Sequence, residues 1–190
     1  MTKNKISLNK TIYVVRHCQS SGQQHSAPLT TEGKVQATLL ADFFRELQVE
    51  RIVSSPFLRA CESIKPLAEQ LRITVEIDER LKERLLSTSM LPDSEWLKQF
   101  RETFDDLDLC LPGGESSRNA MQRAVAVVDE IVQHDATVTV LVTHGNLMTL
   151  LLKHFNEQIG FAQWQSLTNP DVYKIVTDNV NVEVKRIWHI

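Results

Sequence analysis

Residues 11 to 17 read TIYVVRH, so that an arginine and a histidine directly follow a short run of apolar and β-branched residues. The run from Thr11 to Val15 predicts a strand that is buried on both faces. The stretch from Glu32 to Leu47 follows with apolar residues at helical spacing and predicts a helix. Strand, loop and helix in this order form the repeating unit of α/β folds.

The same order returns further along the chain. The next expected elements are strands at 51–53, 73–77 and 138–142 and helices at 56–71, with a proline in its first turn, and at 120–131. This alternation predicts an α/β fold, a three-layer sandwich in which helices flank a central sheet.

The end of the chain departs from this pattern. Residues 172–176 and 182–188 are rich in β-forming residues and are separated by Asp178 and Asn179. Consecutive strands joined by a short connection often pair antiparallel. We therefore expect a mostly parallel but mixed sheet.

Length and spacing suggest one domain over residues 1–190. Residues 1–10 are polar, and we expect them to form a flexible N-terminal tail. Residues 84–111 interrupt the alternation with irregularly spaced apolar residues, which indicates an insertion that acts as a lid or specificity segment. Its aromatic residues Trp96, Phe100 and Phe104 are expected to form an apolar cover beside the active site.

The composition limits the partners. Lysine and arginine number 21 against 24 aspartate and glutamate residues, so no excess of positive charge points to nucleic acid or to a membrane surface. The polar start lacks the apolar segment of a secretory signal, and no run is long enough to span a bilayer, which favours a cytoplasmic location. Three cysteines, at 18, 61 and 110, show no metal spacing and are expected to be reduced thiols. The oligomeric state stays open.

Polar side chains follow three of the predicted strands. Arg16 and His17 follow the first, Arg59 lies one turn into the helix after the second, and His144 and Gly145 follow the late strand. Open α/β sheets bind ligands beyond the carboxyl ends of their strands, so these side chains are expected to converge. Arginine side chains and the N-terminus of a helix beginning after Gly145 both favour a phosphate dianion.

These residues resemble the histidine phosphatase superfamily, the phosphoglycerate-mutase-like fold, whose hallmark is Arg-His-Gly after the first strand. Here the motif is Arg16-His17-Cys18. The likeness continues in the order that the family uses. It runs through Pro28–Ala37, Ser54–Ala60, Leu81–Glu83, Gly113–Ser116 and Thr143–Gly145.

The resemblance implies a role for each residue. His17 would accept the phosphoryl group, Arg16, Arg59 and His144 would hold its oxygens, and Glu83 would move the leaving-group proton. A neutral imidazole nitrogen is a competent nucleophile near pH 7, and the positive cluster would stabilise charge on the phosphoryl oxygens. The mechanism then requires no metal and no other cofactor.

The resemblance also implies phosphate contacts for three further residues. Ser20 matches a phosphate-contacting hydroxyl of the family, and Gln23 stands where the family has an asparagine. Gly145 would offer its backbone to the phosphate.

Glu83 also fits a second interpretation, because residues 78–84 form an alternating charge run of the kind found on solvated faces.

Cys18 raises the alternative of a cysteine phosphatase. That chemistry needs an arginine six residues after the cysteine, whereas position 24 is a glutamine. We therefore expect His17 to be the nucleophile and Cys18 to be a tolerated small residue. A thiol so near two arginines is also expected to have a lowered pKa and to be readily oxidised where solvent reaches it.

The first interpretation of function is a phosphomonoester hydrolase that acts through a phosphohistidine on a small phosphorylated metabolite. The second is a phosphoglycerate-type phosphomutase, and the third a phosphate-binding regulatory module with weak catalysis. Residues 84–111 carry three basic and six acidic residues, a charge of −3, which disfavours a highly anionic bisphosphate. The chain also ends soon after its last predicted strand, where family mutases have a long tail.

Overall fold

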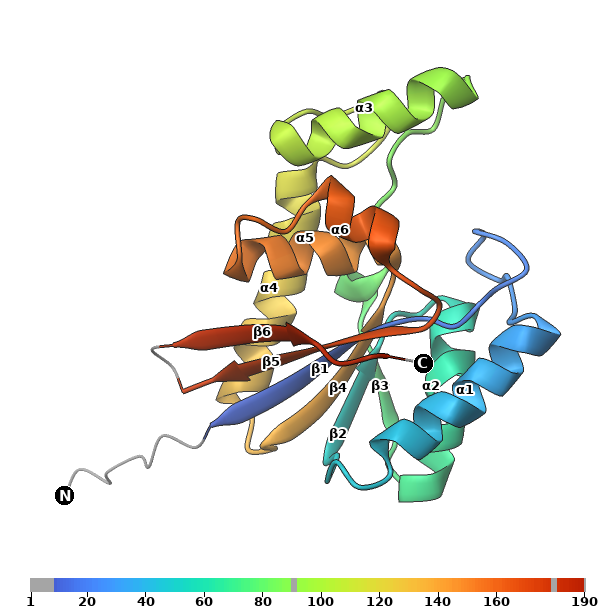
Figure 1. The fold of residues 1–190 in the computed structure, drawn as a ribbon, viewed down its shortest axis with the longest axis vertical. Coiled ribbons are helices and arrows are strands. Elements are labelled where there is room, and N and C mark those ends of the chain that lie inside the picture. Colours follow the sequence, from blue (N-terminus) through green and yellow to red (C-terminus); the bar gives the residue numbers. More distant parts are fainter. Residues whose placement is uncertain (1–8, 90–91, 179–180, 190) are drawn as a thin grey trace.

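The computed structural model describes residues 9–89, 92–178 and 181–189 and contains a mixed sheet with strand order β3-β2-β4-β1-β5-β6 (Figure 1). The three pairings among β1 to β4 are parallel, and the pairings β1–β5 and β5–β6 are antiparallel. The predicted mixed sheet is thus confirmed. The strands are β1 (Lys10–Arg16), β2 (Arg51–Ser54), β3 (Val75–Ile77), β4 (Val138–Thr143), β5 (Asp171–Thr177) and β6 (Val182–Arg186).

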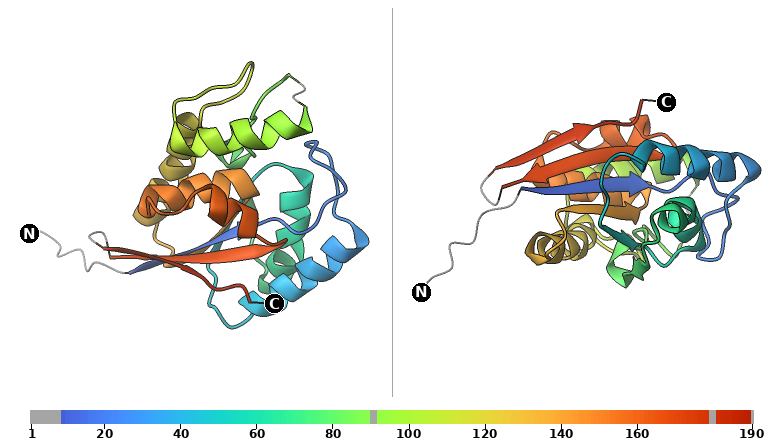
Figure 2. Two further views of the ribbon diagram at one scale, coloured as in Figure 1. Left: turned by 45° about the horizontal axis from the view of Figure 1, so that its top comes forward. Right: turned by 90° about the horizontal axis from the view of Figure 1, so that it is seen from below.

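Helices cover both faces of the sheet, which confirms the three-layer α/β architecture. Helices α1 and α2 lie on one side, and α4 and α5 lie on the other (Figure 1). Figure 2 shows the fold from two further directions, with α3 above α5 and α6 in the left view. The helices are α1 (Thr31–Phe44), α2 (Leu58–Leu71), the short 3₁₀ helix η1 (Glu79–Leu81), α3 (Asp93–Asp105), α4 (Ser117–Gln133), α5 (Gly145–Phe155) and α6 (Phe161–Ser166).

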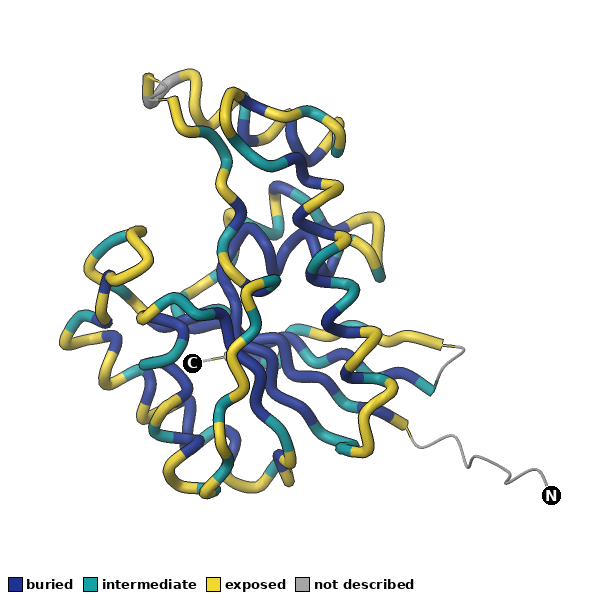
Figure 3. Tube along the Cα trace, turned by 180° about the vertical axis from the view of Figure 1, so that it is seen from behind, coloured by how far each residue is buried: buried dark blue, intermediate teal, exposed yellow. Residues whose placement is uncertain are grey.

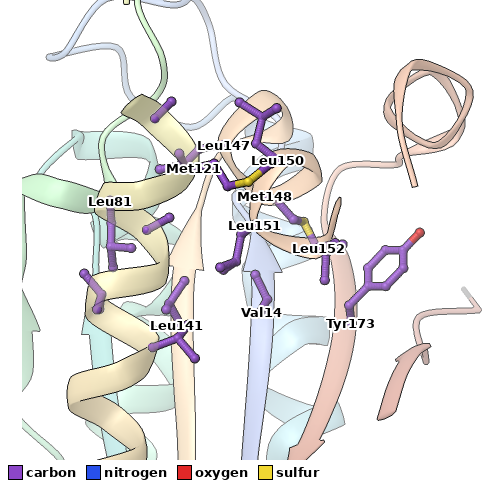
Figure 4. Packing of buried hydrophobic residues seen from close by; sticks show 14 of the residues in the cluster. Val14, Leu81, Met121, Leu141, Leu147, Met148, Leu150, Leu151, Leu152 and Tyr173 are labelled. Atoms are coloured by element: carbon purple, nitrogen blue, oxygen red, sulfur yellow. The ribbon is translucent and has the colours of Figure 1, made fainter. Parts of the chain in front are cut away.

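Strand β1 supplies side chains to both layers of the core. Ile12 and Val14 belong to the cluster with α4 and α5, whereas Tyr13 and Val15 belong to the cluster with α1 and α2. Successive side chains of a strand point to opposite faces, so a strand covered on both sides is apolar throughout. Figure 4 shows Val14 packed among Leu141, Leu151 and their neighbours.

The segment between η1 and α4 leaves the sheet and forms α3 (Figure 3). Phe100 and Phe104 are 2% and 3% exposed, and their rings lie 6.0 and 6.2 Å from the ring of Phe161 in α6. The expectation that both phenylalanines cover the active site is therefore wrong, because they fill the core between α3 and α6. Trp96 is 39% exposed on the same helix. A lid role for residues 84–111 stays a prediction.

Several boundaries also differ from the prediction by a few residues, including those of the tail and of helix α2. The tail expected over 1–10 is wrong for Lys10, which begins β1 and donates from Nζ to the carbonyl oxygen of Ala136 at 2.8 Å. Residues 1–8 of that tail lie outside the described residues. Helix α2 begins at Leu58 rather than at Pro56, with Phe57 as its N-cap. Among the helices of the described ranges, none has the length and apolar character needed to cross a membrane.

The first prediction tests the position of α3. Phe104→Ala should lower the free energy of unfolding by about 3 kcal/mol, because the ring is buried and its removal leaves a cavity. Trp96→Ala on the same helix should cost less than half as much, because Trp96 is partly exposed. Urea denaturation of both variants measures the difference. A loss below about 1 kcal/mol for Phe104→Ala would show that this ring is not a core residue.

Candidate active site

Three parallel strands end at one edge of the sheet. Strands β1 and β4 pair in a register that sets Arg16 beside Thr143, and β4 and β2 pair with Val142 beside Ser54. His17 is fixed just beyond this edge, because its backbone N–H donates to the carbonyl of Thr143 at 3.0 Å. The register thus brings together the residues that follow the three strands, as the sequence predicts.

The His17 ring is 5% exposed and bonded at both nitrogens. Nδ1 lies 2.7 Å from the carbonyl oxygen of Cys18, and Nε2 lies 3.1 Å from Nε of Arg59. A carbonyl only accepts and a guanidinium only donates, so Nδ1 carries the proton and Nε2 presents the lone pair. Burial, together with the charges of Arg59 and Arg16, lowers the pKa of His17 to about 3 against the opposing effect of the Cys18 carbonyl. The ring is a neutral potential nucleophile at Nε2.

Arg59 is the charged group in contact with this nitrogen. Its side chain is 1% exposed, and its terminal NH1 donates to the carbonyl oxygens of Gln23 and Gln24, both at 3.0 Å. The ring of Phe57 lies beneath the guanidinium at 4.7 Å. Burial lowers the pKa of Arg59 and the charge of Glu83 opposes this, but an arginine stays charged in either case.

Arg16 is held by backbone carbonyl groups near the C-terminal end of the chain. Its NH1 donates to the carbonyl oxygens of Leu167 and Thr168 at 3.1 and 3.2 Å, while its Nε is buried and has no partner in the described residues. Gly145 leaves room for this guanidinium, since a Cβ there would lie 3.2 Å from Arg16 Nε. Arg16 therefore has donor capacity left for an anion.

His144 lies beside the His17 ring, with the two ring centroids 5.1 Å apart. Its Nε2 is 2.8 Å from the hydroxyl oxygen of Ser55, and its buried Nδ1 has no partner among the described residues. Burial, followed by the unfavourable electrostatic effect of His17 and the nearby arginines on a protonated ring, places the pKa of His144 well below its ordinary value. Ser55, which directly follows β2, thus orients this ring. The position of Ser55 at a strand end could have marked it as a site residue. A serine in the sequence does not reveal, however, that its partner is His144.

Glu83 follows η1 and caps helix α5. One carboxylate oxygen accepts from the backbone N–H of Asn146 at 3.1 Å, and the other accepts from that of Leu147 at 3.0 Å. The N-terminus of α5, which was expected to bind the phosphate, therefore donates two of its N–H groups to Glu83 instead. Glu83 is half-buried, and its charge acts on both Arg16 and Arg59. It is thus anchored at the N-terminus of α5, near the arginines, rather than free on a solvated face.

Ser20 and Gln23 lie in the loop after β1. The hydroxyl of Ser20 donates to the carbonyl oxygen of Gly22 at 3.0 Å, and the side chain of Gln23 is exposed. Gln23 contributes its backbone carbonyl to Arg59, as described above. Direct phosphate contacts by these two residues stay predictions.

Asn169 supports the site, although nothing in the sequence marks it as a site residue. Its side-chain amide donates to the carbonyl oxygen of His17 at 2.7 Å, across 152 positions of the chain. The fully buried Asp171, paired with Arg186 at 2.6 Å, fixes the same loop by accepting from the backbone N–H of Thr168. The loop between α6 and β5 therefore positions both Arg16 and His17.

Cys18 differs from the expectation of a reactive thiol. The residue is fully buried, and burial raises the pKa of its thiol to about 11 against the opposing hydrogen bond with Ser63. The expected lowered pKa is therefore wrong, because burial outweighs the hydrogen bonds that favour the thiolate. A protonated, enclosed thiol is a poor nucleophile and is not readily oxidised. The geometry favours His17 over Cys18.

Comparison with solved structures shows the same fold elsewhere. A phosphoglycerate mutase from Bacillus anthracis superposes with a TM-score of 0.80 at 20% identity, over 96% of this chain and 94% of that one. A mycobacterial glucosyl-3-phosphoglycerate phosphatase superposes with a TM-score of 0.75 at 22% identity, over 94% and 98% of the two chains. At these identities the likeness establishes architecture and not activity.

Sequence comparison is more specific. A Yersinia pestis protein named probable phosphoglycerate mutase is 30% identical over 158 residues, which cover 74% of this chain and 72% of that protein. The family model of the histidine phosphatase superfamily, branch 1, matches residues 12–188 and so includes the edge of the sheet where His17 and His144 meet. On this match and this geometry, the chain belongs to the histidine phosphatase superfamily.

Proposed function

We propose that this chain hydrolyses a small-molecule phosphomonoester through a phosphohistidine at His17. The observation that carries the proposal is the neutral His17 ring, whose Nε2 lone pair faces the guanidinium of Arg59 while Nδ1 is held by the Cys18 carbonyl. Arg16 and His144 add buried nitrogens without partners in the described residues. Together these groups suit a phosphoryl group with two negative charges.

The reaction has two balanced steps. In the first, His17 Nε2 attacks phosphorus, the P–O ester bond breaks, and the leaving alkoxide takes a proton from the Glu83 carboxylic acid. In the second, water attacks the phosphohistidine and gives a proton to the Glu83 carboxylate, and the P–N bond electrons return to Nε2. Arg16, Arg59 and His144 stabilise the phosphoryl oxygens in both steps. No step draws on a metal ion, and the cytoplasm is the compartment that we propose for it.

The surroundings support a substrate without a second anionic group. Four of the five basic residues between positions 84 and 123 are engaged inside the chain, which leaves the exposed Lys98 of α3 in this described segment. Arg84 donates to the Glu115 carbonyl and the Thr103 hydroxyl, Arg101 lies over the Phe161 ring, Arg118 pairs with Asp108, and Arg123 pairs with Glu115.

A phosphomutase is the second candidate, because the Yersinia pestis relative carries that name. A mutase transfers the phosphoryl group of its histidine to a second hydroxyl and needs cations for a substrate that carries several negative charges. The engaged arginines weigh against it. Release of inorganic phosphate from 4-nitrophenyl phosphate without added metal supports the hydrolase, whereas isomerisation that depends on bisphosphoglycerate supports the mutase. A regulatory module that only binds phosphate would do neither.

The second prediction concerns the nucleophile. His17→Ala should reduce turnover of 4-nitrophenyl phosphate to background, because no other buried imidazole presents a lone pair beside Arg59 in the described residues. Wild-type protein quenched during turnover should carry an acid-labile, base-stable phosphoryl group, detected by phosphopeptide mapping. Cys18→Ala is the matched control and should keep both the activity and the label. A phosphoryl group on Cys18, or an active His17→Ala, would refute the assignment.

The third prediction concerns the leaving group. Glu83→Gln should slow hydrolysis of an alkyl phosphate by roughly 10²-fold or more, the usual scale of general acid catalysis, and that of 4-nitrophenyl phosphate by much less. The weakly basic 4-nitrophenolate hardly needs a proton. The carboxamide also leaves one backbone donor of α5 without an acceptor, so the unfolding midpoint is measured alongside. Equal losses for the two substrates would indicate a purely structural role.

The fourth prediction follows from the neutral state of His17. Its pKa is depressed to about 3 in the folded protein, so its contribution to stability is complete above the unfolded value of 6.5 and is lost as pH falls toward 3. Between pH 7 and pH 5 the wild type should lose about 2 kcal/mol more unfolding free energy than His17→Asn. Urea denaturation at both pH values measures this difference, with the exposed His25→Asn as control. Equal losses in wild type and His17→Asn would mean that His17 is not held neutral.

A further inference from the structure

An aromatic surface adjoins the phosphate-binding groups. The indole nitrogen of Trp164 in α6 would lie 3.5 Å from a Cβ placed on Gly145, and the guanidinium carbon of Arg16 would lie 3.3 Å from the same point. Trp164 and Arg16 are therefore neighbours over the start of α5. A phosphoryl group bound to Nε of Arg16, which has no partner in the described residues, would therefore lie near this indole.

Trp96 of α3 extends this surface. Its ring centroid lies 6.2 Å from that of Trp164, and the two rings are tilted by 60°. Phe100 supports both from the core side, stacked on Trp96 at 5.3 Å and edge-on to Trp164 at 4.6 Å. We call Trp96 and Trp164 the aromatic shelf. Phe100 packs against the core side of both rings, whereas Trp96 is 39% exposed and Trp164 is half-buried.

The composition of this region indicates the chemistry of the ligand. The arginines of α3 and α4 are engaged by carboxylates, carbonyl groups or a ring, as described above, so the shelf offers indole faces rather than free guanidinium groups. Indole faces bind flat or apolar ring faces and gain nothing from a second phosphate. A packed support also keeps the two rings in place before a ligand arrives, which reduces the entropy lost on binding.

We propose that the aromatic shelf of Trp96 and Trp164 selects phosphomonoesters whose alcohol portion carries a ring with an apolar face next to the ester oxygen. The inference rests on the proposed function for the reaction, but recognition of the ring does not require turnover. Trp164 is the specificity-determining residue nearest the phosphate, and Trp96 contacts the far part of the ring.

Binding of two non-hydrolysable probes tests the proposal by isothermal titration. Benzylphosphonate and ethylphosphonate share the anionic group and differ in the ring. Benzylphosphonate should bind wild type about tenfold more tightly, the upper scale for one aromatic pair. Trp164→Leu should abolish this preference and Trp164→Phe should retain most of it, whereas Trp188→Phe, on the opposite face beside Phe43, should leave it unchanged. Equal binding of both probes to wild type would overturn the proposal.

Two further measurements separate the outcomes. If Trp164→Leu does not fold, Trp96→Leu at the more exposed position should lower the preference about threefold, and an unchanged preference would refute the role of the shelf. Hydrolysis of benzyl and ethyl phosphate, which have similar alkyl leaving groups, then tests the reaction separately. Ring preference in binding without release of phosphate would refute the proposed hydrolase and leave the shelf intact. Release of phosphate with equal kcat/KM for both esters would refute the shelf alone.

Discussion

The site depends on keeping one imidazole unprotonated between two guanidinium groups. His17 meets this condition through burial and the charges of Arg59 and Arg16, against the opposing effect of the Cys18 carbonyl, which holds the proton on Nδ1 and leaves the lone pair on Nε2 toward Arg59. Charge repulsion by the arginines and desolvation both disfavour the protonated ring, so His17 stays neutral near neutral pH. The same burial that makes His17 a potential nucleophile also keeps the adjacent Cys18 thiol protonated.

The other groups around this ring come from helix termini and strand ends that also stabilise the fold. Glu83 caps α5 while standing beside the arginines, and Gly145 both begins that helix and leaves space for Arg16. Ser55 holds His144 from the end of β2. Each of these contacts also fixes a helix terminus or a strand end, which holds the surrounding groups in place.

Helix α3 links the stability of the core to the proposed substrate choice. Phe100 and Phe104 anchor it in the core against α6, and Trp96 on its exposed side meets Trp164 near Arg16. One helix therefore contributes a packed inner face and an accessible outer face. In the proposed function, exchange of outer residues would alter recognition of the alcohol portion without changing the proposed phosphoryl-transfer groups, which lie at the strand ends, on α2 and after η1.

The sequence by itself determined the alternation of strands and helices outside η1, α3 and α6, the mixed sheet, and the meeting of Arg16, His17, Arg59 and His144. Hydrophobic periodicity is a local property, and the carboxyl ends of adjacent parallel strands meet at one edge whatever the details of packing. Only the tertiary structure decided how deeply Phe104 is buried and what Glu83 binds. The same holds for the support of His17 by Asn169, which comes from a loop 152 positions away. Burial and hydrogen-bond partners depend on segments that are distant in the chain, and the pKa of a buried group follows from them, so no local pattern encodes these features.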